Sequence, residues 1–326
     1  MPTEPEIAAH AAAIVEILRR HDRILVAAHG APDGDAVGCT IAMGWILKAM
    51  GKEAVLLNAS GLPAHFSWMS SPGRIYRRMY ELPFWPELVV ALDCGDAWRL
   101  GKELLEALPR IPSVNIDHHL GNPAYGSLYN WIEPGMAAVG QMVAALADAA
   151  GIPITGPLAE SIYVSLVSDT GSFTYGNTTP AVFTLAARLL AGGLDAGSVR
   201  DRMDNQWSMA KTRLWGTLLR SISLEHEGRV ALCRVTLDEL GEAGAVKEDI
   251  EGFAEQMRKI QGVRIAVLLR EDKPSGSKLS LRSCGEDDVR EVAAQFGGGG
   301  HKNAAGARLD MTLDKAVPAV LAALKL

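Results

Sequence analysis

Imidazole and carboxylate side chains gather in short turns of this sequence, several of them directly after an apolar run. In chain order they are His29, Asp33, Asp35, Asp93, Asp117, His118, His119 and Asp169. Carboxylate oxygens with some imidazole nitrogens form a donor set of intermediate hardness, which suits Mn²⁺ first and also allows Mg²⁺ or Co²⁺. Four carboxylates would offset the charge of two such ions. We therefore expect a two-metal centre made from His29, Asp33, Asp35, Asp93, His118 and Asp169.

The competing interpretation is that each turn is only the polar end of a strand. A single Asp at such a turn more often caps the following helix than binds a metal. Three polar clusters at successive strand ends would each need a separate explanation of this kind, and the adjacent His118 and His119 have no capping function. The set as a whole therefore favours the metal centre.

The elements that must position these residues alternate between strands and helices. Strands are predicted at 24–28, 54–57, 88–92 and 113–116. Helices are predicted at 6–20, 36–50, 136–150 and 156–168. This alternation predicts an α/β fold with a doubly wound, mainly parallel sheet. Ligand sites of such sheets lie beyond the carboxyl ends of the strands, where the polar turns begin.

The pattern changes after residue 180. Two helices, a hairpin and further strands are predicted at 180–192, 208–220, 224–237, 263–269 and 278–282. A helix at 286–296 precedes four glycines and His301, and a last helix is predicted at 312–325. Taken alone, the glycine run reads as a flexible linker or a helix end. We predict a metal-binding catalytic domain at 1–190, a helical linker at 191–215 and a smaller α/β domain at 216–326.

Composition limits the partners of the protein. The net charge of −6 argues against a large surface for long nucleic acids, although metals can still hold a short polyanion. The four cysteines are scattered, which is typical of reduced thiols in the cytosol. The N-terminal residues lack the basic and apolar regions of a signal peptide, and no apolar run reaches the roughly 20 residues that cross a bilayer. We expect a cytoplasmic protein without a membrane partner.

The polar turns resemble the four motifs of the DHH phosphoesterase superfamily. The segments concerned are His29–Ala36, Asp93–Asp96, Asp117–His119 and Ser168–Gly171. Ser280–Ser283 and Gly297–Gly306 resemble the DHH-associated substrate-binding domain. The matching motifs span nearly the whole chain in the expected order. Within the superfamily the chain most resembles the nanoRNase type, which acts as an oligoribonuclease and a 3′-phosphoadenosine 5′-phosphate (pAp) phosphatase.

The resemblance implies a role for each residue. His29 and Asp33 would hold one ion, and Asp35, His118 and Asp169 the other, with Asp93 bridging both. A water between two ions loses a proton near neutral pH and becomes the nucleophile. His119 would face the scissile phosphate, while Asp117 would fix an imidazole in its required orientation. The family therefore assigns catalysis to His119, Asp93 and Asp117.

The resemblance also implies what the second domain does. Its glycines let backbone N–H groups approach an anion closely. The implied substrate-binding residues are Arg282, Ser283, Gly298, Gly299, Gly300 and His301. They would complete an active site in the cleft between the domains. The implied substrates are very short oligonucleotides, cleaved to 5′-mononucleotides, and pAp; a homodimer is plausible from the family.

Other functions remain open at this point. Some relatives hydrolyse cyclic di-AMP or its linear product. A manganese pyrophosphatase would carry a Ser-Arg-Lys-Lys type of cluster, and a RecJ-type exonuclease would need a basic, aromatic-lined groove; neither is found in the sequence. A non-catalytic nucleotide sensor would be expected to lose at least one of the clustered carboxylates, yet all six metal positions are filled.

Overall fold

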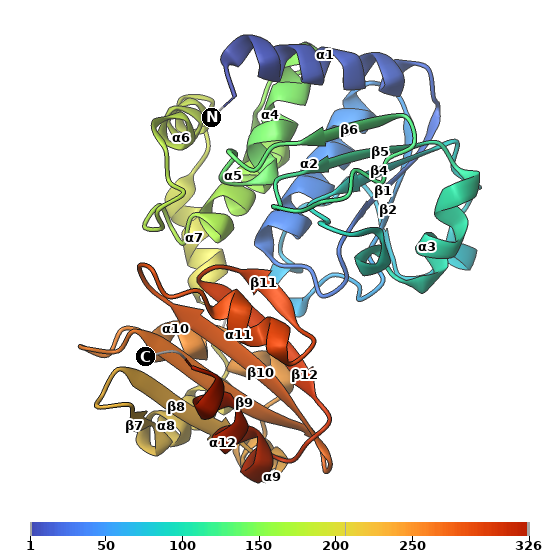
Figure 1. The fold of residues 1–326 in the computed structure, drawn as a ribbon. Coiled ribbons are helices and arrows are strands. Elements are labelled where there is room, and N and C mark those ends of the chain that lie inside the picture. Colours follow the sequence, from blue (N-terminus) through green and yellow to red (C-terminus); the bar gives the residue numbers. More distant parts are fainter. Residues whose placement is uncertain (1, 206, 325–326) are drawn as a thin grey trace. The chain divides into compact units, whose positions relative to one another are not determined.

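The protein is described here by a computed structural model that covers residues 2–205 and 207–324. It divides into two compact units, within Met1–Gln206 and Trp207–Leu326. Figure 1 shows that each unit contains its own sheet with helices packed against it. The α/β class and the smaller second domain that the sequence predicts are thereby confirmed.

The sheet of the first unit has six strands, and every neighbouring pair is parallel. In spatial order they are β3 (Ile75–Tyr76), β2 (Glu53–Leu57), β1 (Arg23–Ala28), β4 (Leu88–Leu92), β5 (Ser113–Asp117) and β6 (Tyr129–Ile132). The order reverses between β1 and β4, so the doubly wound sheet predicted from the sequence is confirmed. The two edge strands, β3 and β6, were not predicted because two and four residues carry too little periodicity.

Helices cover both faces of this sheet (Figure 1). On one face lie α1 (Glu4–Arg19), α2 (Gly34–Ala49), α4 (Val139–Ala149) and α5 (Gly156–Asp169). The other face packs against α3 (Lys102–Ala107), η3 (Ala97–Leu100) and η4 (Leu108–Arg110). Successive β1 residues alternate between these two cores, since Ile24 and Val26 join the first and Leu25 and Ala27 the second. Burial on both faces explains why the strands read as continuous apolar runs.

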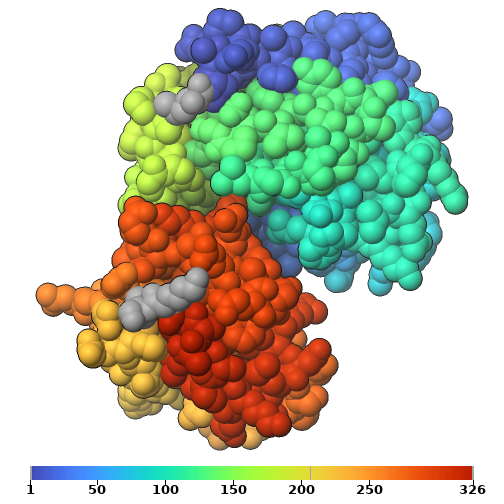
Figure 2. All heavy atoms as spheres, viewed as in Figure 1, coloured from blue at the N-terminus to red at the C-terminus, as the bar shows by residue number. Residues whose placement is uncertain are grey.

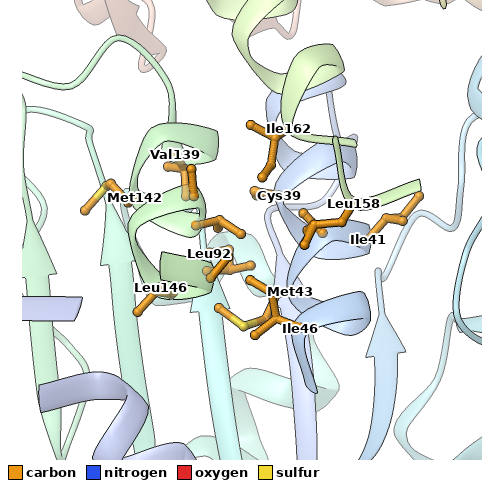
Figure 3. Close-up of a cluster of buried hydrophobic side chains, with 14 of the residues drawn as sticks. Cys39, Ile41, Met43, Ile46, Leu92, Val139, Met142, Leu146, Leu158 and Ile162 are labelled. Atoms are coloured by element: carbon orange, nitrogen blue, oxygen red, sulfur yellow. The ribbon is translucent and has the colours of Figure 1, made fainter. Parts of the chain in front are cut away.

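Helix α2 lies at the centre of the first core. Thirteen of its 16 residues are buried, and it packs against both α4 and α5. Figure 3 shows Cys39, Met43 and Ile46 of α2 facing Leu92 of β4 and apolar residues of α4 and α5. The helix begins at the turn that contains Asp33, so this packing fixes the position of the turn.

The first unit contains further helices besides those that pack on the centre of the sheet. Figure 2 shows the α1 segment, in blue, at the surface over the green segment that includes α4, on which α1 packs. The other elements are η1 (Ala64–Phe66), η2 (Met79–Glu81), α6 (Pro180–Ala191) and α7 (Ala196–Asp204). Among the described residues, no single helix is long and apolar enough to cross a membrane; α6 and α7 meet that test only as a pair bent by 108°.

The second unit has a mixed six-stranded sheet. In spatial order it contains β11 (Gly299–His301), β12 (Ala304–Leu309), β10 (Gly276–Ser283), β9 (Ile265–Lys273), β8 (Val230–Val235) and β7 (Ser223–Glu225). Only β8 and β9 pair in parallel. One face packs against α11 (Val289–Gln295) and α12 (Leu313–Ala323). The other packs against α8 (Met209–Ser221), α9 (Leu237–Ala243), η5 (Lys247–Ile250) and α10 (Phe253–Met257).

Two sequence expectations look different in the structure. The segment predicted as a helical linker, 191–215, contains α7 and the start of α8, and the division between the units falls within it. The glycine run, which taken alone reads as a flexible linker or a helix end, follows α11 but continues into a strand, because Gly299 and Gly300 belong to β11, which pairs with β12. Pairing with a neighbouring strand satisfies the backbone of the run, a contact that no local pattern reveals.

Candidate functional site

Asp33 caps the helix α2 and also faces an imidazole of the predicted metal site, two roles that the sequence analysis treated as alternatives. Its Oδ1 accepts hydrogen bonds of 3.1 Å from the backbone N–H groups of Asp35 and Ala36, and so caps α2. Its Oδ2 lies 3.7 Å from Nε2 of His29. The helix cap therefore leaves one carboxylate oxygen directed toward the imidazole.

Asp35, two residues later, is fully buried in the first turn of α2. Its Oδ1 accepts a 2.6 Å hydrogen bond from the hydroxyl of Ser165, and its Oδ2 accepts a 2.8 Å bond from the backbone N–H of Val139. Val139 is the first residue of α4, whose N-terminal N–H groups favour a nearby negative charge. The N–H of Gly140 in turn donates to the Ser165 hydroxyl. Three elements thus hold this carboxylate in place.

Asp93 follows β4 directly and lies between two imidazoles. Its Oδ2 is 3.6 Å from Nε2 of His29, and its Oδ1 is 3.6 Å from Nε2 of His118. Its backbone φ is +49°, a left-handed conformation that residues other than glycine rarely adopt. The strained turn directs the two oxygens of one buried carboxylate toward two different groups of ligands.

The Nδ1 atoms of both imidazoles face carbonyl oxygens. Nδ1 of His29 lies 3.0 Å from the Gly30 oxygen, and Nδ1 of His118 lies 3.1 Å from the Met136 oxygen. A carbonyl can only accept, so each Nδ1 carries the proton and each Nε2 of a neutral ring keeps its lone pair. Nε2 of His118 and Oδ1 of Asp93 are buried and have no hydrogen-bond partner among the described residues. A buried nitrogen or oxygen whose lone pair accepts no hydrogen bond is suited to coordinate a metal ion.

Asp117 and His119 form a pair beside this cluster. Asp117, the last residue of β5, is buried, and its Oδ1 lies 2.8 Å from Nδ1 of His119. The carboxylate therefore fixes the ring of His119, whose Nδ1 lies 3.5 Å from Oδ1 of Asp93. Asp96 instead caps η3 by accepting from the N–H of Trp98.

The structure brings all six predicted ligands together with His119. Three groups have ligand atoms within 4.8 Å of one another: His29, Asp33 and Asp93; Asp35, His118 and Asp169; and Asp93, His118 and His119. The groups overlap at Asp93 and His118. The donors are carboxylate oxygens and imidazole nitrogens, so this part of the described chain fits divalent cations such as Mn²⁺ or Mg²⁺.

The cluster also perturbs its own ionisation. Burial and then the charge of Asp169 raise the pKa of Asp35 to about 8. Burial and the charges of Asp35 and Asp33 raise the pKa of Asp93 well above its ordinary value. Burial lowers the pKa of His118, but Asp169, whose Oδ2 lies 3.2 Å from Nε2, and the neighbouring carboxylates outweigh it and raise that pKa. Cations would relieve this repulsion, which is the electrostatic signature of a functional site.

Sequence reasoning missed two residues that support the cluster. Ser165 binds Asp35, and the side chain of Asn58 donates a 2.9 Å hydrogen bond to the carbonyl of His29. Ser165 lies four residues before Asp169 on α5, a spacing that places both on one helix face and could have indicated its role. Asn58 follows β2 and gave no comparable signal.

The predicted substrate residues of the second unit occupy different faces of its sheet. Nε of Arg282 donates a 2.5 Å hydrogen bond to Oε1 of Glu255, and Nη1 donates to the Leu281 carbonyl. Ser283 is buried, donates to the Asp287 carbonyl and accepts from Asn303. Because side chains alternate along a strand, Ser280 shares the face of Arg282 and Ser283 does not.

The glycines differ in what they contribute locally. A Cβ on Gly298 would lie 2.1 Å from the Gly306 oxygen, so close packing excludes any side chain there. Gly300 has a φ of +137°, and a Cβ would lie 2.5 Å from the Ala304 oxygen. At Gly299 a Cβ would meet nothing within 4 Å. His301 ends β11 and is exposed. Their contact with substrate, like that of Arg282 and Ser283, stays a prediction.

Comparison with known proteins identifies the family. The first unit matches the DHH family, N-terminal domain, over residues 23–166, and the second matches the DHHA1 domain over residues 228–326. The chain therefore belongs to the DHH family of phosphoesterases and is a hydrolase that acts on phosphoester bonds. The resemblance read from its motifs is confirmed.

The particular relatives are more specific. The chain is 32% identical over 323 residues to the bifunctional oligoribonuclease and PAP phosphatase NrnA of Thermus thermophilus. The alignment covers 96% of this chain and 92% of that protein. It is 25% identical over 339 residues to the cyclic-di-AMP phosphodiesterase PdeA of Listeria monocytogenes, covering 96% of this chain and 49% of that protein. The crystal structure of an exopolyphosphatase-related protein from Bacteroides fragilis superposes with a TM-score of 0.89 at 28% identity, over 97% of this chain and 95% of that one.

Proposed function

We propose that this protein is a Mn²⁺-dependent phosphodiesterase of very short oligonucleotides that also dephosphorylates pAp. The observation that carries the proposal is the position of Asp93, whose two oxygens lie 3.6 Å from the Nε2 atoms of His29 and His118. One carboxylate between two imidazole-containing groups is the arrangement expected of a pair of divalent cations. The similarity to NrnA over nearly the whole chain supports the substrate class.

We assign the two groups of ligands to two cations. His29 and Asp33 would hold one, Asp35, His118 and Asp169 the other, and Asp93 would bridge them; Mg²⁺ or Co²⁺ are the alternatives to Mn²⁺. Bound cations would supply an activated water and neutralise charge on the phosphate.

The remaining residues of the cluster act on the substrate or on one another. Asp117 accepts a 2.8 Å hydrogen bond from Nδ1 of His119, which leaves Nε2 as the ring nitrogen available to the phosphate. His119 would thereby support charge that develops during hydrolysis. Ser165 and the start of α4 hold Asp35 so that it does not reorient as the cluster changes charge.

For the second unit we propose a role in binding one end of the substrate. The guanidinium of Arg282 has five N–H donors, of which the structure uses one with Glu255 and one with the Leu281 carbonyl. The others suit a phosphate. Arg282→Ala should raise KM for a dinucleotide about tenfold with little change in kcat. Arg290→Ala, which removes an exposed arginine of the same unit paired with Asp288, should leave KM unchanged.

A competition assay tests the proposed function. The protein with Mn²⁺ is offered a dinucleotide, pAp, cyclic di-AMP and a long single strand, and initial rates are compared. Faster hydrolysis of the dinucleotide and of pAp than of the long strand is expected. A preference for the long strand would overturn the assignment.

The second candidate is a phosphodiesterase of cyclic di-AMP or its linear product. The similarity to PdeA favours it, although that relative is about twice as long as the region matched. The same assay decides between the two, because this candidate requires cyclic di-AMP or its linear product to be hydrolysed faster than both pAp and a dinucleotide of other bases.

A further inference from the structure

The strained turn at Asp93 is held from outside by two side chains of the loop between β5 and β6. A left-handed residue other than glycine costs roughly 1–2 kcal/mol, so its surroundings must enforce the conformation. The carbonyl of Cys94, the next residue, accepts a 2.9 Å hydrogen bond from Oη of Tyr125 and a 3.3 Å bond from Nδ2 of Asn122. The peptide between Cys94 and Gly95, one residue beyond Asp93, is thereby fixed in direction.

Asn122 also contacts the Asp117–His119 pair. Its Nδ2 donates a 2.6 Å hydrogen bond to Oδ2 of Asp117, whose Oδ1 lies 2.8 Å from Nδ1 of His119. Its Oδ1 accepts from Nδ2 of Asn115 at 3.0 Å and from the backbone N–H of Ala124 at 2.8 Å. Two donors to one oxygen determine which way the carboxamide points. Asn122 therefore presents its N–H groups to Cys94 and Asp117 together.

Tyr125 can act only as a donor to the Cys94 carbonyl. Burial raises the pKa of its hydroxyl far above the ordinary value, so the proton stays on the oxygen at every relevant pH. The ring packs against the core that includes Leu104 and Cys94. Tyr125 lies in the loop between β5 and β6, and the packing of its ring on this core places the hydroxyl.

We propose that Asn122 and Tyr125 are positioning residues for the reaction, which hold the Asp93 turn in register with the Asp117–His119 pair. Among the described residues, neither forms a hydrogen bond with a predicted metal ligand. They act through Cys94 and Asp117, and they keep the two oxygens of Asp93 directed at their separate groups while the ring of His119 stays oriented. The inference deepens the proposed function and rests on it for its kinetic test.

Two conservative variants test the proposal. Tyr125→Phe removes one hydroxyl, and Asn122→Asp replaces the N–H donor by a carboxylate that repels Asp117. Each should lower kcat by about 10–100-fold, the usual effect of disturbing groups behind metal ligands, with KM within about twofold of the wild type. Tyr125→Phe should also raise the dissociation constant of Mn²⁺ by about tenfold, measured by calorimetric titration without substrate.

Asn130→Ala provides the matched control. Asn130 makes two hydrogen bonds of 2.7 Å with Gly126, and in the described part of the chain its side chain forms no hydrogen bond with Cys94 or Asp117. It should lose stability but keep kcat. The proposal is overturned if Tyr125→Phe keeps both kcat and Mn²⁺ affinity within twofold of wild type, or if Asn130→Ala loses as much kcat. If the wild type hydrolyses no phosphoester, the proposed function fails, while Mn²⁺ affinity still tests the positioning role.

Discussion

Replacing Asp93 by Asn should stabilise the metal-free protein while it destroys metal binding. Asp93 is 2% exposed, and no described residue donates a hydrogen bond to its Oδ1. Its carboxylate is therefore a buried charge among other carboxylates, offset only in part by His118. Asn has the same shape and no charge, so it removes the repulsion without opening a cavity.

The magnitude follows from burial and depends on pH. A buried charge without full compensation costs on the order of 2–3 kcal/mol. For a unit of this size that corresponds to a rise in melting temperature of about 4–12 °C. Because the pKa of Asp93 is raised in the folded protein, the native state binds more protons than the unfolded state above pH 3.8. The free energy of unfolding of the wild type therefore falls as pH rises through this range. The stability advantage of Asp93→Asn should accordingly grow from pH 5 to pH 8.

Scanning calorimetry of the chelator-treated protein measures the effect. At pH 8, Mn²⁺ at 100 times its dissociation constant should stabilise the wild type by about 2.7 kcal/mol and Asp93→Asn far less. Turnover of the variant should fall by at least about 100-fold. Asp201→Asn, a change of the same kind on the exposed surface of α7, should alter neither property. A metal-free Asp93→Asn that melts at or below the wild type at pH 8 would refute the reasoning.

Three further outcomes follow from the site and its core. Ser165→Ala should weaken Mn²⁺ binding by about tenfold in a calorimetric titration, because it removes the 2.6 Å hydrogen bond to Asp35 and leaves the N–H of Gly140 unpaired. Gly38→Ala should lower the free energy of unfolding by about 3 kcal/mol, since its Cβ would lie 2.5 Å from the Ser161 oxygen; tolerance of this change in a denaturant titration would contradict the close packing of α2 on α5. Gly216→Ala, in the middle of α8 with open space around it, should instead stabilise the protein by up to about 1 kcal/mol in the same titration.

Local pattern was enough to predict most of the first sheet and the cluster at its edge. β1 and β4 are runs of buried, largely apolar residues, and β5 is a buried strand that also contains Ser113 and Asn115. Each leads into a polar turn, so chain order alone indicated a shared edge. The ligand types then restricted the chemistry. Asp33 shows the limit of such reasoning. The sequence treated helix capping and metal binding as alternatives, whereas in the structure one oxygen of Asp33 caps α2 and the other faces His29.

The second unit was harder to predict because its sheet is mixed. Antiparallel strands such as β11 and β12 are defined by their partners, and a glycine run has no side chains from which to read a period. The face on which a strand residue lies is set by register. Arg282 and Ser283 were grouped as neighbours in sequence, whereas the register of β10 with β9 and β12 puts them on opposite faces.

The sequence by itself determined the family, the α/β class and the residue types of the cluster, since motifs and apolar periodicity are local properties of the chain. Only the tertiary structure decided which oxygen of Asp93 faces which imidazole, which ring nitrogen of His118 carries the proton, and that Asn122 and Tyr125 hold the Asp93 turn. Those features depend on hydrogen bonds between segments many residues apart. Their geometry is fixed by packing on both faces of the sheet, with α2, α4 and α5 on one face and α3 on the other, which no local pattern encodes.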